Sequence, residues 1–157
     1  MQFGTVQFTA VATALGNGSQ ISALTLTATL LITAGIAIKA GMVPFHGWVA
    51  DAYSSAPAAV SVLIGGIVTK MAGMYAIIRL GMDVFPAVKP MTMSILILGT
   101  ISIVVGAVVA MGQTDFKKVL AYSSISQLGY IAIGVATASP IGLAGALLHF
   151  FNHSTFK

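Results

Sequence analysis

The sequence has 157 residues, of which 57% are hydrophobic and 6% charged, and it carries a formal net charge of +4 at pH 7. Because a soluble domain has about a quarter of its residues charged, this composition excludes a water-facing globular surface and therefore a soluble enzyme. The small, scattered positive charge argues against nucleic acid as a partner, the absence of cysteine excludes disulfides and thiolate metal sites, and without a cofactor-binding motif we expect no cofactor.

Five apolar runs predict an all-α integral membrane protein, because about 20 apolar residues cross the roughly 30 Å of hydrocarbon in a bilayer. We expect residues 1–21, which are too short to span, to form an interfacial or loop segment, and residues 22–157 to belong to one transmembrane domain. The last run is still continuing where the sequence stops at Lys157, so we expect a truncated helix and an excerpt of a larger helical bundle. The predicted helices cover residues 22–45, 57–80, 91–111, 118–138 and 141–157.

The first predicted helix should be broken near Gly41 and Pro44. Proline has no N–H to donate to the carbonyl four residues earlier, here that of Ala40. Carbonyls freed beside Lys39 suit a water-lined break, which is where irregular backbone is tolerated at membrane depth. We therefore interpret Lys39 as a proton-transfer residue; the alternative is a lysine that extends its ammonium to the interface at the end of the helix.

Lys70 lies near the middle of the second predicted helix. A lysine at the bilayer centre costs about 2.5–3.5 kcal/mol on insertion scales, so an intramembrane ionisable group is interpreted first as functional. We predict that Lys70 transfers protons. The alternative is a structural lysine bonded to backbone carbonyls of a neighbouring helix.

The end of the sequence places His149, His153 and Lys157 four residues apart, on one stripe of a helix. Because histidine titrates near neutral pH, this stripe is a candidate proton wire. Histidines that only bond to neighbouring helices are the alternative. A zinc site would lack its third protein ligand, so we predict no metal.

The fourth predicted helix carries Ser123, Gln127 and Tyr130 on one face. These side chains either support a water path or hydrogen-bond helices together. Asp115 should cap the start of this helix. No glutamate occurs in the chain, so a carboxylate partner for the lysines would have to come from outside it.

Four segments, in order, resemble the antiporter-like membrane subunits of respiratory complex I, of membrane-bound hydrogenases and of Mrp-type sodium/proton antiporters. The first two are 39–57 (KAGMVPFHGWVADAYSSAP) and 65–79 (GGIVTKMAGMYAIIR). The second two are 113–130 (QTDFKKVLAYSSISQLGY) and 149–157 (HFFNHSTFK). The one departure that we see is Ala50, where many members have proline before the aspartate.

The resemblance implies that Lys39 is the lysine on the broken helix, that Lys70 is the connecting lysine, and that His149 and His153 belong to the central relay. It implies a proton-translocating subunit without a redox centre, not catalytic by itself, in a complex I-like or hydrogenase-type assembly with membrane and peripheral partner subunits. The alternatives are an Mrp-type cation/proton antiporter subunit and a structural or nonfunctional membrane fragment. The expected location is a prokaryotic cytoplasmic membrane or an energy-transducing organelle membrane.

Overall fold

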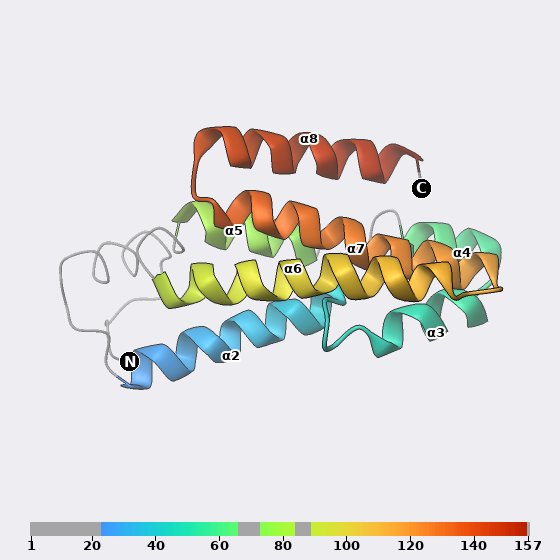
Figure 1. Ribbon diagram of the computed structural model, residues 1–157, viewed down its shortest axis with the longest axis horizontal. Coiled ribbons are helices and arrows are strands. Elements are labelled where there is room, and N and C mark those ends of the chain that lie inside the picture. The colour runs from blue at the N-terminus through green and yellow to red at the C-terminus, as the bar shows by residue number, and fades with distance from the viewer. Residues whose placement is uncertain (1–22, 66–72, 84–88, 157) are drawn as a thin grey trace.

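A computed structural model describes residues 23–65, 73–83 and 89–156, and every regular element in these ranges is a helix (Figure 1). Residues 64–65 and 73–74 are wound as π-helix, next to α4 and α5. The predicted segment 1–21 lies outside the described residues. The helices are α2 (Ala23–Ala40), α3 (Gly47–Ser55), α4 (Ala58–Leu63), α5 (Tyr75–Asp83), α6 (Lys89–Met111), α7 (Phe116–Ala136) and α8 (Pro140–Phe156).

The helix ends agree with the sequence-based expectation for the last three helices within two residues. At α7, the Asp115 carboxylate accepts a hydrogen bond from the Lys117 amide at 2.9 Å, so the predicted N-cap is confirmed. At α8, Pro140 occupies the first helical position, where its missing N–H has no helical partner to lose. The Ser139 hydroxyl accepts from the Gly142 amide at 3.0 Å and completes that end.

The stretch between the predicted helices 22–45 and 57–80 contains a helix that the sequence did not predict. Residues Gly47–Ser55 form helix α3, which buries Val49, Ala50 and Tyr53. These side chains pack in a cluster with Ala121 and Ile125 of α7. Residues 47–55 are helical because three apolar side chains at helical spacing meet a neighbouring helix. Hydropathy along the sequence does not reveal that contact.

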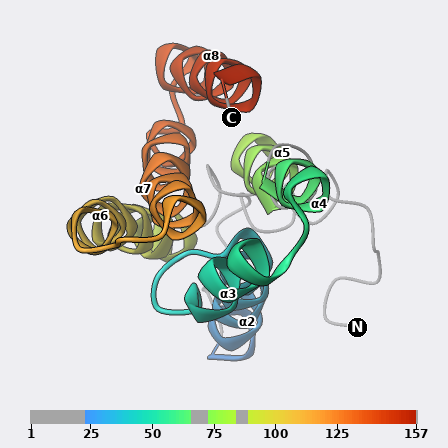
Figure 2. The same cartoon turned by 90° about the vertical axis from the view of Figure 1, so that its right-hand side faces the viewer.

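The helices are layered, with α7 and α6 between α8 on one side and α2 on the other (Figures 1 and 2). Helices α4 and α5 stand beside α7, on the side away from α6 (Figure 2). The main buried cluster joins Ala37 of α2, Ile77 of α5, Ile95 of α6 and Ile131 of α7. The core therefore lies where α7 meets helices from both ends of the sequence.

Helices α6 and α7 approach closely because glycines face each other across their contact. A Cβ atom at Gly129 would meet the backbone oxygen of Gly99 and the side chain of Ile103. The Ser126 hydroxyl donates to the Ile103 carbonyl across the same contact at 3.1 Å. Small residues and interhelical hydroxyl bonds are the usual means by which membrane helices pack.

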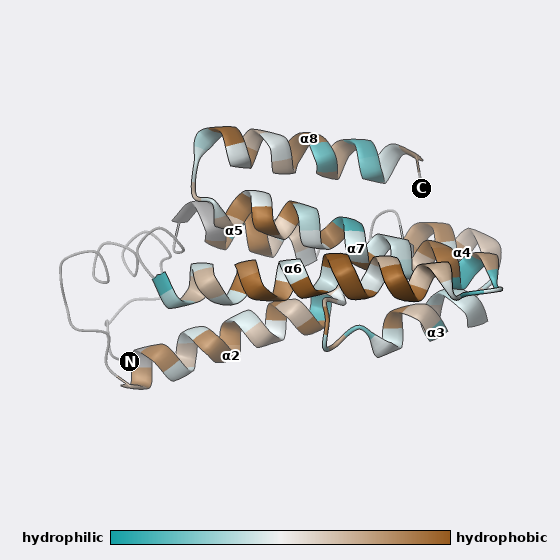
Figure 3. Ribbon diagram, in the orientation of Figure 1, coloured by the Kyte–Doolittle hydropathy of each residue, from teal (hydrophilic) through white to brown (hydrophobic). Residues whose placement is uncertain are grey.

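Two of the described helices, α6 and α7, are long and apolar enough to span a bilayer. Figure 3 shows α6 as largely hydrophobic, with hydrophilic residues gathered in the second half of α8. Large apolar side chains also point outward, including Leu31 (73% exposed) and Ile141 (86%). The fold is thus an apolar helical bundle; the count of five spans stays a prediction.

Candidate functional site

Helix α2 ends at Gly41, which adopts a left-handed conformation with φ +74°. The Gly41 amide donates to the Ile38 carbonyl at 3.1 Å, and the Met42 amide donates to the Ala37 carbonyl at 2.9 Å. This pair of bonds is a Schellman motif, in which glycine is favoured at the left-handed position. The last helical residue of α2 is therefore Ala40, next to the residues where the sequence predicts a break.

The cause of the break differs from the one expected from Pro44. The left-handed turn at Gly41 has already ended the helix, and Pro44 lies three residues further on in the connector. Glycine has no Cβ at this position, where one would collide with the Val49 side chain. Because backbone conformation rather than a missing N–H stops the helix, Gly41 is the residue on which the break depends.

Two side chains bond to the backbone on either side of the point where α2 ends, one to Ile38 in α2 and one to Val43 in the connector. The Trp48 indole Nε1 donates to the Ile38 carbonyl at 3.1 Å, from the first turn of α3. The Ser102 hydroxyl of α6 accepts from the Val43 amide at 3.0 Å. These bonds give partners to the Val43 amide and the Ile38 carbonyl, as burial of backbone polar groups in an apolar bundle requires.

Lys39 lies in the last turn of α2, directly before the break, and its side chain is exposed on this chain. A cation at this end of a helix interacts favourably with the unpaired carbonyls and the negative end of the helix dipole. Lys39 therefore lies in the last helical turn before the connector. Its proton-transfer role stays a prediction.

His149 and His153 lie on one stripe of α8, as their spacing predicts. Their rings are stacked, with centroids 6.2 Å apart and planes inclined by 5°. His153 is fully buried, whereas His149 is half-buried. His149 Nε2 is buried and has no hydrogen-bond partner among the described residues. Two imidazoles one helical turn apart can exchange a proton through a single bridging water.

Of the three polar residues predicted on one face of α7, Tyr130 reaches the histidine stripe. The centroids of the Tyr130 and His149 rings are 6.0 Å apart. Ser123 and Gln127 are half-buried on the same helix, and the Ser123 hydroxyl donates to the Leu120 carbonyl at 3.0 Å. The water-path role of all three residues stays a prediction.

The predicted proton-transfer residues do not all come together in the described part of the chain. Lys39 on α2 and the histidines on α8 lie on opposite sides of the α6–α7 layer (Figure 2). Lys70 and Lys157 lie outside the described residues. The described site therefore has two parts, the break after α2 and the histidine stripe of α8. The described residues hold no group of three or more His, Asp or Glu side chains that could bind a metal.

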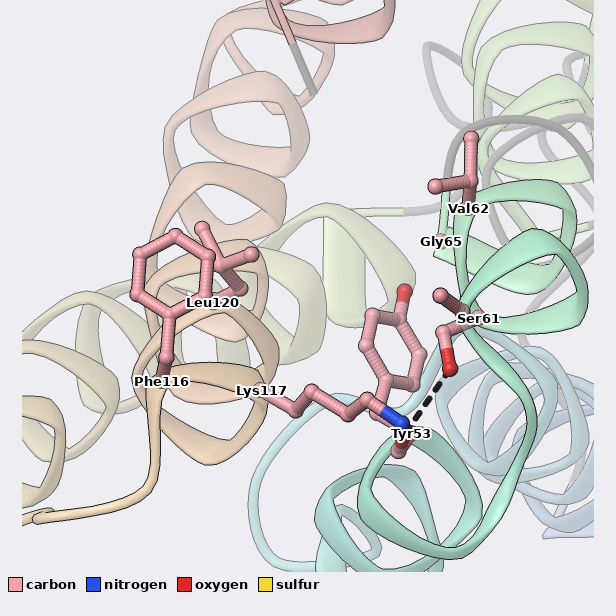
Figure 4. A pocket seen from close by; sticks show the side chains of 8 residues that line it. Tyr53, Ser61, Val62, Gly65, Phe116, Lys117 and Leu120 are labelled. Carbon is pink, nitrogen blue, oxygen red and sulfur yellow. Dashed lines mark hydrogen bonds between the residues drawn. The ribbon is translucent and has the colours of Figure 1, made fainter.

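A third polar feature, which sequence reasoning missed, lies where α3, α4 and α7 meet. Lys117 Nζ donates to the Ala56 carbonyl at 2.7 Å and caps the end of α3. Figure 4 shows Lys117 extending from α7 beneath the Tyr53 ring, with the Ser61 hydroxyl donating to the Tyr53 carbonyl at 2.9 Å. These residues line a cavity of about 190 Å³.

Sequence reasoning also missed Ser102, and for His46 it predicted only an interfacial pair with Asp51. Ser102 is one of four hydroxyl-bearing residues in α6, with Thr92, Ser94 and Thr100, so no signal in the sequence set it apart. The His46 ring meets the Tyr122 ring of α7 edge-on, with centroids 6.0 Å apart. Its buried Nδ1 has no hydrogen-bond partner within the described ranges. Nothing in the spacing of His46 predicted this contact, which depends on how α3 packs.

The apolar helical bundle, the broken helix with a lysine at its end and the paired histidines define a helical membrane protein with titratable groups on its helices. Over residues 1–157 the chain matches the family described as NADH:quinone oxidoreductase/Mrp antiporter, TM. It therefore belongs to this family of integral membrane proteins, as the sequence motifs predict.

Relatives come from two kinds of complex. The chain is 37% identical to NADH-quinone oxidoreductase subunit N of Desulforudis audaxviator over 139 residues, which are 87% of this chain and 28% of that protein. It is 40% identical to NAD(P)H-quinone oxidoreductase chain 4 1 of Picosynechococcus sp., covering 89% of this chain and 26% of that protein. A solved Mrp complex from Dietzia sp. DQ12-45-1b superposes with a TM-score of 0.82 at 32% identity, covering 96% of this chain and 27% of the matched chain.

Proposed function

We propose that this chain forms part of a proton-translocating, antiporter-like membrane subunit in a redox-driven complex of the NADH:quinone oxidoreductase type. The chain spans about a quarter of the length of the relatives that it matches. In this proposal residues 22–157 are part of the translocating domain, residues 1–21 are interfacial, and about five helices cross the membrane. Its partners are further membrane and peripheral subunits, in a prokaryotic cytoplasmic or energy-transducing organelle membrane.

The stacked pair His149 and His153 is the observation that carries the proposal. Two imidazoles lie one turn apart on a helix of an apolar bundle, and ionisable groups at membrane depth are costly to keep, so they are interpreted first as functional. The Tyr130 ring beside His149 adds a hydroxyl-bearing side chain to the same path. In the proposal, protons pass along this stripe and reach Lys39 and Lys70 through groups outside the described residues, with Lys157 continuing the stripe.

The second candidate function is cation/proton antiport in an Mrp-type complex. It is favoured by the superposition on the Mrp complex over nearly the whole chain. Both functions move protons through the same residues, and they differ in the driving force. A redox complex responds to NADH, whereas an antiporter responds to a sodium gradient.

The test measures proton movement in inverted membrane vesicles from cells that make the protein in its native complex. A pH-sensitive dye reports the response to NADH and, separately, to a pulse of sodium. We expect His153→Ala and His149→Gln each to lower the initial rate by at least about tenfold, because a positioned proton-transfer group contributes a factor of about 10²–10⁴. Asn152→Ala, an exposed position on the same helix, is the matched control.

The amount of assembled complex, measured on native gels, separates loss of transfer from loss of folding. Full assembly with a slowed response to NADH supports the redox-driven function. A response to sodium alone supports the antiporter. Rates in both histidine variants equal to that of Asn152→Ala would overturn the proton-wire assignment and favour a structural role for the histidines.

A further inference from the structure

The backbone N–H of Val43 lies in the connector between α2 and α3, outside any helix. Val43 is 8% exposed, and its amide donates to Ser102 Oγ at 3.0 Å. Ser102 lies 59 residues further along the chain, on α6, and is fully buried. A hydroxyl inside one apolar helix thus completes the backbone bonding of a distant broken segment.

A second hydrogen bond, within α6, fixes the orientation of the Ser102 hydroxyl. The hydroxyl donates its proton to the Leu98 carbonyl of its own helix at 2.7 Å. Because a hydroxyl has one proton and two acceptor sites, this bond leaves the oxygen lone pairs to accept from Val43. Both partners are buried away from solvent, and a buried amide that loses its acceptor costs free energy without compensation from water.

We infer that Ser102 is a positioning residue, which fixes the broken segment against α6 and so sets the location of the last turn of α2. The inference rests on the proposed function, in which the Lys39 ammonium in that turn transfers protons. A second bond, from the Trp48 indole to the Ile38 carbonyl, ties α3 directly to α2. It joins the two helices that flank the connector, whereas Ser102 ties the connector itself to α6.

Another serine of α6 provides the matched comparison. The Ser94 hydroxyl donates to the Pro90 carbonyl of its own helix at 2.8 Å, the same intrahelical bond that Ser102 makes. Ser94 is half-buried, and within the described ranges it makes no hydrogen bond to the connector. If Ser102 acts through its own helix alone, Ser94→Ala and Ser102→Ala should behave alike.

We call the hydrogen bond from the Val43 amide to Ser102 Oγ the latch. The first measurement is the rate at which a thiol at residue 43 reacts with a maleimide. The chain has no cysteine, so Val43→Cys introduces a single buried thiol of similar size within it, and mass spectrometry of the peptide containing residue 43 follows its labelling in the native complex. Adding Ser102→Ala should raise the labelling rate by about tenfold, because the buried amide without an acceptor favours local opening. Adding Ser94→Ala should leave the rate unchanged.

The second measurement is the initial rate of proton movement per assembled complex, driven by NADH or sodium as in the test of function. Ser102→Ala should lower it by about tenfold, since small misplacements of transfer groups have large effects on rate. Ser102→Thr keeps the accepting oxygen and should restore both the rate and the slow labelling. Ser94→Ala should match the unchanged protein.

Faster labelling together with slower proton movement in Ser102→Ala, both reversed in Ser102→Thr, supports the inference. Unchanged labelling in Ser102→Ala would overturn the latch itself. Faster labelling with an unchanged rate of proton movement would overturn the positioning role. Lys39→Ala in parallel isolates the proposed function: an unchanged rate in that variant removes Lys39 from the pathway, whereas the labelling result still reports on the latch.

Discussion

The break after α2 and the α7–α8 pair present polar groups inside an apolar bundle in opposite ways. At the break the backbone leaves the helical path. There the Ile38 carbonyl accepts from the Gly41 amide and the Trp48 indole, and the Val43 amide donates to Ser102. In α8 the backbone stays helical, and polarity is carried by side chains such as His153. The first solution depends on contacts from distant segments, and the second depends on spacing within one helix.

This difference separates two kinds of sensitivity to mutation. The break should lose stability when a residue that determines its backbone conformation is replaced, because the connector has no regular secondary structure of its own. The α7–α8 pair should lose stability when α7 loses its close packing against α6, the helix on its other side. Four stability predictions test this contrast, each read as the midpoint of thermal unfolding of the detergent-purified complex, with assembly checked on native gels.

The largest loss of stability is expected for Gly41→Ala. A Cβ atom there collides with Val49, and alanine is strained at φ +74°. Adding a left-handed cost of about 1–2 kcal/mol to an overpacking cost of about 1–3 kcal/mol gives about 3 kcal/mol. Gly35→Ala is the control, because a Cβ atom at Gly35 would meet no atom within 4 Å among the described residues. Equal midpoints for the two variants would show that Gly41 does not govern the break.

The next largest effect is expected for Gly129→Ala in α7. Its Cβ would press on the Gly99 backbone oxygen and on Ile103 and force α6 and α7 apart. Overpacking of this kind costs about 2 kcal/mol. Gly145→Ala on α8, where the described structure leaves open space, should leave the midpoint unchanged or raise it, because alanine favours helix. A midpoint of Gly129→Ala equal to that of Gly145→Ala would refute close α6–α7 packing.

A smaller loss is expected for Trp48→Phe, which keeps an aromatic ring and removes the indole N–H that bonds to Ile38. The carbonyl of Ile38 keeps its bond from the Gly41 amide, so the cost should be near about 1 kcal/mol or below. Tyr75→Phe, at an exposed aromatic on α5, should leave the midpoint unchanged. The anchor assigned to Trp48 is wrong if both variants unfold at the same temperature.

The smallest effect is expected for Asp115→Ala at the start of α7. Its carboxylate caps the Lys117 amide at an exposed helix end, where water can replace it. The loss should be about 0.5–1 kcal/mol, the lower part of the range for N-cap residues. Asp115→Asn keeps a side-chain acceptor and should retain most of the stability. A larger loss in the asparagine variant than in the alanine variant would rule out the cap.

Much of the α7–α8 pair could be predicted from the sequence. The apolar runs predict α6, α7 and α8 within two residues, Asp115 and Pro140 mark the starts of α7 and α8, and the spacing of His149 and His153 predicts one stripe. These features are local, since the helical repeat of 3.6 residues and the orphan amides of a helix start are properties of a few adjacent residues.

The sequence by itself thus determined an apolar all-helical chain, its break beside Lys39 and the histidine stripe, because composition, glycine and spacing act over one or two helical turns. Only the tertiary structure decided that Gly47–Ser55 is helical, that Ser102 accepts from the Val43 amide and that Tyr130 lies against His149. Each of these contacts joins residues that are distant in the chain or belong to different helices. They arise when buried polar groups and apolar faces find partners across helices, and no local pattern specifies which partner that will be.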